Sequence, residues 1–406
     1  MDALNIAKAM GKEDVLKKIA SSGLTEYGIF QVVVADYYKQ VLKERNKKKS
    51  NEPFTVIAAL NNADTKGVLL EILKENPDKV LDGILIAAYV TGAVRVVLQL
   101  PEYATELADS LESKAKEVGV TIQTGLVDVR ANKYNVMNHI ITMAALSDII
   151  TDSYETGVYV SVNGGNCKKY RDDILVGEVL ADANIDLADI KALETGYVFS
   201  SHTVIEKKIS EAGVTNGVLN VVTSKDCIIQ ETEKRLLSSK KQGCGKCVFC
   251  REGLNQLYCM ETDIRDGKGK PEYSEIIEEI GYAMTFSTQC SMGQESAKIA
   301  LSSIALFEKE YEEHIKKKVC AAGICYNKSL IYIDPHICEG CEECMDVCLA
   351  DCIEGKKGFI HLIDEFDCTQ CGKCISACKY HAIIQTTGKP PKLPDRLLKV
   401  GKFKKH

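Results

Sequence analysis

The stretch Cys338-Glu-Gly-Cys341-Glu-Glu-Cys344-Met-Asp-Val-Cys348 decides how the C-terminal quarter of this 406-residue chain folds. Its cysteines follow the spacing C-x2-C-x2-C-x3-C. The same spacing returns about thirty residues later, in Cys368, Cys371, Cys374 and Cys378. Two complete copies are not expected by chance or from a disulfide framework. Because such a tight loop presents three thiolates to three irons of one cubane, the pattern predicts two [4Fe-4S] clusters.

The two copies together resemble the domain of bacterial ferredoxins that holds two clusters. In that pattern the fourth cysteine of each copy leads into a helix and ligates the other cluster. The predicted ligand sets are Cys338, Cys341, Cys344 and Cys378 for one cluster, and Cys348, Cys368, Cys371 and Cys374 for the other. Cys352 lies just after the first copy and is interpreted as a thiol that is not a ligand. The alternative is that it exchanges with a ligand.

A third pattern, C-x2-C-x2-C, is formed by Cys244, Cys247 and Cys250, and it has no fourth cysteine nearby. The nearest suitable candidate is Cys290, about forty residues further on. Residues 272–286 and 295–318 are expected to be helical, since apolar side chains recur at helix spacing in the second segment. We therefore predict a small helical bundle that holds one [4Fe-4S] cluster from two loops.

The motifs around these four cysteines resemble a known family. The run Gly243-Cys-Gly-Lys-Cys-Val-Phe-Cys-Arg-Glu-Gly253, followed by Cys290-Ser-Met-Gly-Gln294, is similar to the cluster domain of the NADH-oxidising flavoprotein subunit of respiratory complex I. It is more similar to relatives of that subunit in anaerobic electron-bifurcating hydrogenases and transhydrogenases, which carry a two-cluster ferredoxin domain at the C-terminus. The resemblance covers most of the chain, and it is strongest from about residue 156 onward.

The family's N-terminal domain holds FMN, and this chain keeps only part of the corresponding motif. Ser22-Gly23-Leu24 matches the start of the family's glycine-rich phosphate loop, but Thr25 to Phe30 contain one glycine where the family has several. Consecutive glycines let backbone N–H groups approach a phosphate closely. Glu26 also adds a charge of the wrong sign. We therefore expect that FMN is not bound.

The contacts to the nicotinamide are also expected to be lost. Asn62-Ala63-Asp64 matches the family, but the acidic loop after it is reduced to Thr65-Lys66-Gly67. The family's glycine-rich and Glu-Glu segment is missing between about Val120 and Asn138. The sequence contains neither G-x-G-x-x-G nor a Walker A motif. This pattern predicts a degenerate flavin-type scaffold without a working NADH site.

Length and composition indicate a multidomain α/β protein. The net charge of -6 and the pI near 5.8 give no sign of nucleic-acid binding. No apolar run is long enough to span a bilayer. The N-terminal residues lack the hydrophobic segment of a signal peptide. Since cysteine-rich chains without a secretion signal usually keep their thiols reduced for metal, we expect a cytoplasmic protein.

Five segments are predicted along the chain. Helices at residues 3–20, 66–76 and 104–118 alternate with strands at 55–60, 95–100 and 120–123. Residues 156–228 resemble the small β-grasp (SLBB-like) domain of the family. The predicted segments are a degenerate flavin/NADH-type α/β domain at 1–150, the β-grasp domain at 156–228, a helical [4Fe-4S] domain at 232–318, a two-cluster ferredoxin domain at 319–388 and a basic tail at 389–406.

The remaining cysteines suggest one further metal site. His314, Cys320 and Cys325 precede the ferredoxin domain, and the family relatives have a similar linker suited to structural zinc. Zn²⁺ accepts mixed cysteine and histidine ligands. The alternative is two buried thiols beside an exposed histidine, and a fourth ligand is not identifiable from the sequence. We expect Cys167, Cys227 and Cys259 to be isolated, small buried residues.

These patterns predict an iron-sulfur electron-transfer subunit of a cytoplasmic oxidoreductase complex. Three [4Fe-4S] clusters would relay single electrons between a flavin-bearing partner and ferredoxin or another carrier. The sequence offers no convincing catalytic acid, base or nucleophile. The alternative is an FMN-containing NAD(P)H dehydrogenase subunit of an electron-bifurcating complex. A third hypothesis, a structural adaptor that only docks partners, disagrees with the complete sets of cluster cysteines.

Overall fold

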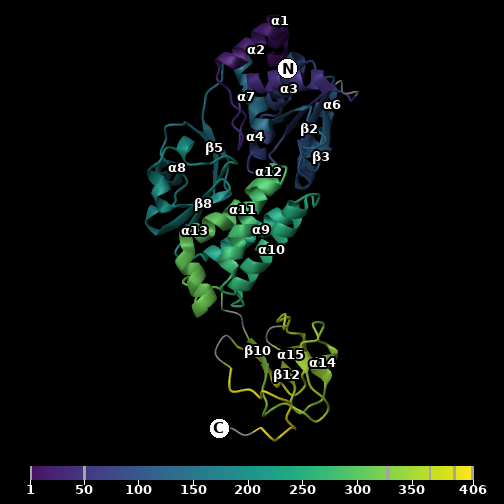
Figure 1. Cartoon of the computed structure of the whole chain (residues 1–406), viewed down its shortest axis with the longest axis vertical. Coiled ribbons are helices and arrows are strands. Elements are labelled where there is room, and N and C mark those ends of the chain that lie inside the picture. Colours follow the sequence, from purple (N-terminus) through teal and green to yellow (C-terminus); the bar gives the residue numbers. More distant parts are fainter. Residues whose placement is uncertain (1, 49–51, 326–329, 365–366, 387–389, 404–406) are drawn as a thin grey trace. The chain divides into compact units, whose positions relative to one another are not determined.

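The computed structural model describes residues 2–48, 52–325, 330–364, 367–386 and 390–403 (Figure 1). The chain forms two compact units, Met1–Ala322 and Gly323–His406. Among the described residues, no helix is both long enough and apolar enough to cross a membrane. The first unit combines a parallel sheet with helices, which agrees with the α/β class expected from the sequence.

The N-terminal part of the first unit is a four-stranded, fully parallel sheet in the order β3-β2-β1-β4, with helices packed against it. The elements are α1 (Asp2–Met10), α2 (Lys12–Ser21), α3 (Val34–Lys48), β1 (Thr55–Ala59), α4 (Leu70–Glu75), α5 (Pro77–Thr91), β2 (Arg95–Leu100), η1 (Glu102–Ala104), α6 (Thr105–Glu117), β3 (Thr121–Thr124), β4 (Val136–His139) and α7 (Ile140–Ile150). The single helix expected over residues 3–20 is divided in two at Gly11, whose φ of 86° is incompatible with a continuing helix.

The core of this part lies between the sheet and the helices α1, α2, α3, α5 and α7. Every residue of β1 is buried, as expected for a parallel strand covered on both faces. Helices α5 and α7 approach each other closely at Gly83, where an added Cβ would lie 1.7 Å from the carbonyl oxygen of Met143. A residue without a side chain is therefore required at this crossing.

A five-stranded sheet in the order β6-β5-β9-β7-β8 follows. Its elements are β5 (Val158–Val162), β6 (Lys168–Tyr170), α8 (Val176–Asp182), η2 (Leu187–Asp189), β7 (Ile190–Thr195), β8 (Val198–Ser201), η3 (His202–Glu206), η4 (Ile209–Glu211) and β9 (Val218–Thr223). β5 and β9 are parallel, and the other neighbouring strands are antiparallel. Helix α8 contributes Val176, Val179 and Leu180 to the core of this sheet. A small mixed sheet with one helix is compatible with the predicted β-grasp domain.

A group of helices completes the first unit, and Figure 1 shows them in green below the parallel sheet. They are α9 (Ile228–Gln242), α10 (Val248–Arg265), α11 (Tyr273–Ser287), α12 (Ser291–Glu295), α13 (Lys298–Glu312) and the π-helical turn η5 (Glu313–Lys317). A chain of buried hydrogen bonds joins three of these helices, running from Thr232 through Ser303 and Tyr311 to Glu261, with each link 2.8 Å long. Burial raises the pKa of Glu261 to about 8. This polar chain fixes how α9, α10 and α13 pack around one another.

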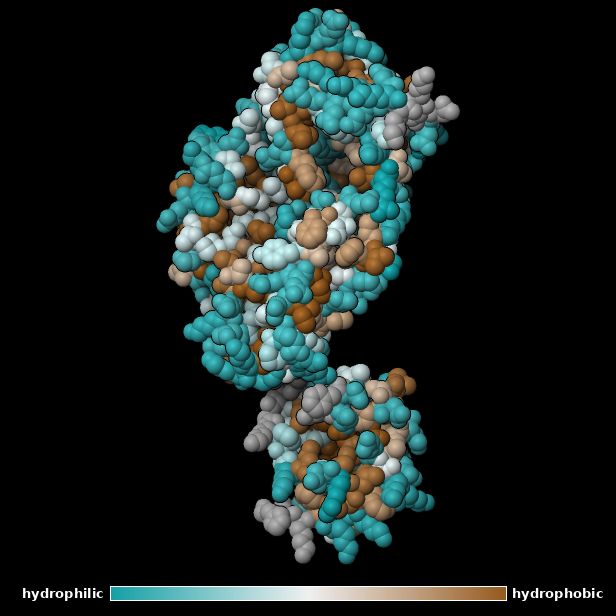
Figure 2. Space-filling view, in the orientation of Figure 1, coloured by the Kyte–Doolittle hydropathy of each residue, from teal (hydrophilic) through white to brown (hydrophobic). Residues whose placement is uncertain are grey.

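The second unit is small and rich in loops. Its elements are β10 (Leu330–Ile333), α14 (Glu343–Asp346), β11 (Ile353–Glu354), β12 (Leu362–Ile363), α15 (Lys373–Ala377) and β13 (Ile383–Thr386). β10 pairs with β13 and β11 with β12, both antiparallel. The core of this unit includes five cysteines, Cys338, Cys344, Cys352, Cys374 and Cys378. Figure 2 also shows hydrophobic side chains at the surface of this unit. Among its described large hydrophobic residues, Leu349 is the most exposed, at 84%.

Candidate iron-sulfur and metal centres

The first turn of α10 and the loops before α10 and α12 bring the cysteines of the third pattern together. Cys247 directly precedes α10, and Cys290 directly precedes α12. Burial raises the pKa of Cys250 to about 12, with further contributions from the nearby thiols of Cys290, Cys244 and Cys247. Cys244 is exposed and the other three are half-buried. The four predicted ligands thus gather at the surface of the first unit, and a metal would stabilise their thiolates.

Arg130, which no motif in the sequence indicates, contacts this group from the segment after β3. Its Nη2 lies 3.9 Å from Cys247 Sγ, and its Nε donates to Oε1 of Gln289. In the same segment, Asp128 pairs with Lys246 at 2.7 Å, which ties the segment to the cysteine loop. A guanidinium beside the cysteines adds a positive charge where a cluster would carry a negative one. No local signal marks Arg130, because it is 117 positions from Cys247.

In the second unit, one cavity is lined by four cysteines: Cys338, Cys341, Cys344 and Cys378. Burial raises the pKa of Cys344 to about 12, and the other three thiols contribute to that shift. The backbone N–H of Ala382 donates to Cys378 Sγ over 3.4 Å. The fourth cysteine of the second copy therefore lies with the first three of the first copy. Their role as ligands of one cluster stays a prediction.

A second cavity contains the complementary set: Cys348, Cys368, Cys371 and Cys374. Cys352 lines the same cavity, with its Sγ 3.4 Å from Cys348 Sγ. Burial, together with the neighbouring thiols of Cys348 and Cys368, raises the pKa of Cys352 to about 12. Five thiols thus lie where one cubane requires four. Whether Cys352 exchanges with a ligand stays a prediction.

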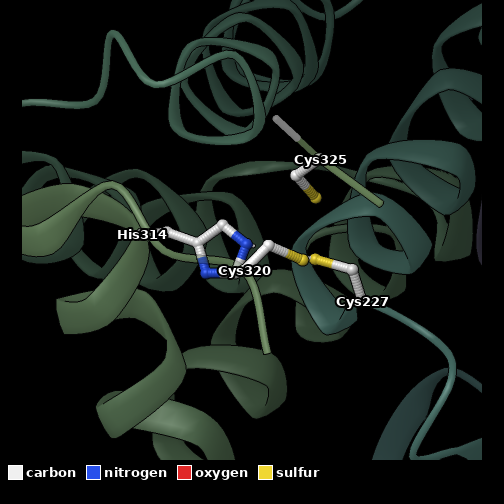
Figure 3. Close-up of side chains that lie close together, drawn as sticks. All are labelled: Cys227, His314, Cys320 and Cys325. Carbon is white, nitrogen blue, oxygen red and sulfur yellow. Dashed lines mark hydrogen bonds between the residues drawn. The ribbon is translucent and has the colours of Figure 1, made fainter. Parts of the chain in front are cut away.

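A separate group combines Cys227, His314, Cys320 and Cys325, whose potential ligand atoms all lie within 4.8 Å of one another. Figure 3 shows the thiols of Cys227 and Cys320 meeting beside the imidazole of His314. Cys227 directly precedes α9, and His314 lies on η5. Three cysteines and one histidine form a donor set suited to tetrahedral Zn²⁺. The tertiary structure thus places Cys227 as the candidate for the fourth ligand, which the sequence did not identify.

The hydrogen bonds of His314 orient its ring for metal binding. Its Nδ1 lies 2.8 Å from the carbonyl oxygen of Glu310, so Nδ1 carries the proton and donates it there. Nε2 then faces Cys227 Sγ at 3.3 Å and is available as a ligand. Such a second hydrogen bond is the usual support of a metal-binding histidine. The alternative interpretation of the sequence, two buried thiols beside an exposed histidine, was wrong about the histidine, because His314 is only 1% exposed.

Two of the other cysteines differ from the sequence-based expectation. Cys227 is buried, as expected, but it is not isolated, because it contacts His314. Cys259 is exposed rather than buried, since it lies on the solvent-facing side of α10. Cys167 is buried and belongs to the core around the parallel sheet.

At the carboxyl end of the parallel sheet, the carboxylate of Glu26 accepts two hydrogen bonds from residues that lead into α7. Glu26 Oε1 accepts from the backbone N–H of His139 at 2.5 Å, and Oε2 accepts from the side-chain amide of Asn138 at 2.5 Å. His139 directly precedes α7, and its Nε2 lies 3.1 Å from Asp64 Oδ2. Burial raises the pKa of Glu26 to about 7. The start of a helix beside the end of a parallel strand is a common anion site.

A cavity of about 460 Å³ lies beside this carboxylate, lined by residues 22–28 and by residues 154–159. The hydroxyl of Tyr27, which belongs to this lining, is buried without a hydrogen-bond partner among the described residues. Several carboxylates, among them Asp148 and Asp172, also line the cavity. The lining thus combines these carboxylates with the ammonium group of Lys169.

Comparison with known proteins identifies two regions that match protein families. Residues 232–314 match the NADH-ubiquinone oxidoreductase-F iron-sulfur binding region, and residues 361–384 match a 4Fe-4S binding domain. The chain is 33% identical over 170 residues to the NADP-reducing hydrogenase subunit HndC of Solidesulfovibrio fructosivorans, covering 42% of this chain and 35% of the relative. It is 31% identical over 94 residues to an NADH-quinone oxidoreductase subunit of Streptomyces coelicolor, covering 23% of this chain and 21% of the relative.

The fold is similar to that of a chain in the crystal structure of an NAD⁺-reducing [NiFe]-hydrogenase in the H2-reduced state. The TM-score is 0.65 at 15% identity, and the match covers 76% of this chain and 64% of the other. The matches to the two curated relatives span only about a third and a fifth of their lengths. The resemblance expected from the cysteine motifs is confirmed: this chain carries the NADH-ubiquinone oxidoreductase-F iron-sulfur binding region together with a 4Fe-4S binding domain, and it is similar to complex I flavoprotein subunits.

Proposed function

We propose that this chain is an electron-transfer subunit of a cytoplasmic oxidoreductase complex and relays single electrons through three [4Fe-4S] clusters. The observation that carries the proposal is the grouping of twelve predicted ligands into three sites, two of them cavities in the second unit. Each cubane exchanges one electron at a potential set by charge, solvent exposure and hydrogen bonds to sulfur. The chain's own residues hold the clusters and control these surroundings.

The contacts of Glu26 support a flavin that is held by a partner rather than by this chain. The backbone N–H of His139 and the amide of Asn138 already donate to the Glu26 carboxylate. A phosphate at this position would have to displace the half-buried side chain of Glu26 from both of its hydrogen-bond donors. Ferredoxin or a similar one-electron carrier would then exchange electrons with the other end of the relay.

The alternative is an FMN-containing NAD(P)H dehydrogenase subunit, and the cavity of about 460 Å³ is the observation that favours it. Its volume lies within the range of about 300–1,000 Å³ that is usual for small-molecule sites. Acid release of about one FMN per chain, together with NADH-dependent reduction of a dye, would establish this alternative. We expect neither.

Cys227, His314, Cys320 and Cys325 would hold a structural Zn²⁺. The metal would join the start of α9 to the end of the α13–η5 segment through ligands distant in sequence. Structural zinc contributes directly to the free energy of folding. We expect about one zinc per chain in elemental analysis, and Cys227→Ser should remove it, whereas Cys167→Ser, at a buried cysteine outside this group, should leave it in place.

The experiment that tests the function is iron analysis of the chain purified without oxygen. Three cubanes require about twelve iron and twelve acid-labile sulfide per chain. Cys290→Ala should lower the iron content to about eight, because it removes a ligand of one cluster. The matched control is Cys259→Ala, which replaces an exposed cysteine outside all three groups. Iron near eight in the unmodified chain, unchanged by Cys290→Ala, would contradict the third cluster.

A further inference from the structure

A buried histidine lies in the wall of the cavity formed by Cys338, Cys341, Cys344 and Cys378. His361 is 1% exposed, and its Nδ1 lies 3.9 Å from Cys338 Sγ. This distance is at the long end of hydrogen bonds to sulfur. A thiolate bound to iron can only accept a hydrogen bond, so the ring nitrogen facing it must be the donor.

The surrounding backbone is shaped to hold this ring. A Cβ added at Gly355 would lie 2.0 Å from Cδ2 of His361 and 2.5 Å from its Nε2. The ring therefore occupies space that a side chain at position 355 would need. Nε2 is buried and has no hydrogen-bond partner among the described residues. Because burying an unpaired polar atom is unfavourable, an apolar side chain would fill this place more favourably unless the ring acts on the cavity.

The backbone carbonyl of Phe359 is a competing acceptor beside the ring. It is neutral, whereas an iron-bound thiolate carries negative charge. Hydrogen bonds to a charged acceptor are roughly twice as strong as those between neutral groups. With a cluster in the cavity, the contact from Nδ1 to Cys338 is therefore favoured over the contact to Phe359.

The two cysteine cavities of the second unit differ in this respect. The described lining of the cavity with Cys348, Cys368, Cys371 and Cys374 contains no histidine, and a fifth thiol, Cys352, lies there instead. A reduced cubane carries one more negative charge than an oxidised one. A donor at a ligand sulfur stabilises the reduced form and thus raises the potential. The side chains therefore bias the two sites differently.

We propose that His361 positions an N–H on the sulfur of Cys338 and raises the reduction potential of this cluster above that of its neighbour. The proposal rests on the proposed function, because it requires [4Fe-4S] clusters in both cavities. His361 is thus a positioning residue that gives the electron a preferred resting site within the second unit. It neither ligates iron nor takes part in a chemical step.

The test is a redox titration of the complete chain, purified without oxygen and followed by electron paramagnetic resonance. In His361→Phe we expect the potential of one cluster to fall while the other stays unchanged and iron content is retained. In His361→Gln, whose side chain can still donate a hydrogen bond, the same potential should fall less. Gly355→Ala displaces the ring without removing it and should lower the same potential. The control His336→Phe replaces an exposed histidine outside the cavity and should change nothing.

The outcomes separate the inference from the function on which it rests. If the unmodified chain lacks the signals of both clusters, the proposed function fails. If both clusters are present and neither potential moves in His361→Phe, the function stands and the inference is overturned. If His361→Phe loses four iron, its cluster potential cannot be compared, and the test then depends on His361→Gln and Gly355→Ala. Unchanged cluster potentials in both of these variants would also overturn the inference.

Discussion

Replacement of Glu26 by glutamine should change how the stability of the first unit depends on pH. In the folded chain the pKa of Glu26 is raised from 4.5 to about 7 by burial. Because the pKa is raised in the folded state, the stability that protonated Glu26 contributes is fully present below pH 4.5. This contribution is lost as the pH rises through 7. A shift of this size corresponds to about 3 kcal/mol in total, at about 1.4 kcal/mol per pKa unit.

Because glutamine does not titrate, the variant does not lose stability at this position as the pH rises. It should be the less stable protein at pH 5, because its NH2 group would face one of the two donors that Glu26 accepts from, at a cost of about 1–3 kcal/mol. Between pH 5 and pH 8 the difference in free energy of unfolding should then move in favour of the variant by about 2–3 kcal/mol.

Urea unfolding followed by circular dichroism at pH 5, 6, 7 and 8, without oxygen, measures this difference. Hydrogen exchange of the peptide that contains His139 shows whether the change lies at this site. The control is Glu13→Gln, which replaces an exposed carboxylate on α2. Parallel stability curves for Glu26→Gln and the wild type over the whole range would refute the reasoning. They would show that the pKa of Glu26 is not raised at this position.

The other predictions concern the metal centres and the helix crossing. Cys247→Ser should block electron passage through the complex while leaving the partner's flavin reducible by its own substrate. Electron passage at the wild-type rate in a stopped-flow assay would show that the cluster bound by Cys247 lies off the path. Cys227→Ser should lower the unfolding temperature and abolish its sensitivity to a zinc chelator, and a chelator effect that persists would exclude this group as the zinc site. Gly83→Ala should destabilise the first unit by about 1–3 kcal/mol or more, since its Cβ would meet Met143, and a normal urea midpoint would contradict the packing described for α5 and α7.

Much of the fold was predictable because local patterns carry it. The strand at residues 95–100 has the predicted bounds, and the helices expected at 104–118 and 272–286 are found within one residue at each end. Expectations were least accurate where a single residue interrupts a pattern. Gly11 divides the first helix, and the segment expected as one helix over residues 295–318 begins at the end of α12 and contains α13 and the π-helical turn η5. A positive φ or a kink depends on the surroundings and leaves little trace in hydrophobic periodicity.

The sequence by itself determined the cluster motifs, because three ligands of each predicted cubane lie within one short loop, with two residues between neighbouring cysteines. It also predicts that the phosphate loop is lost, because residues 25–30 contain one glycine where the family has several. Only the tertiary structure decided which distant side chains share a site. It brings Cys227 to His314, Arg130 to Cys247 and the Glu26 carboxylate to the start of α7, and it places His361 in the wall of a cysteine cavity. These contacts arise from the packing of whole helices and sheets, so no spacing along the chain records them.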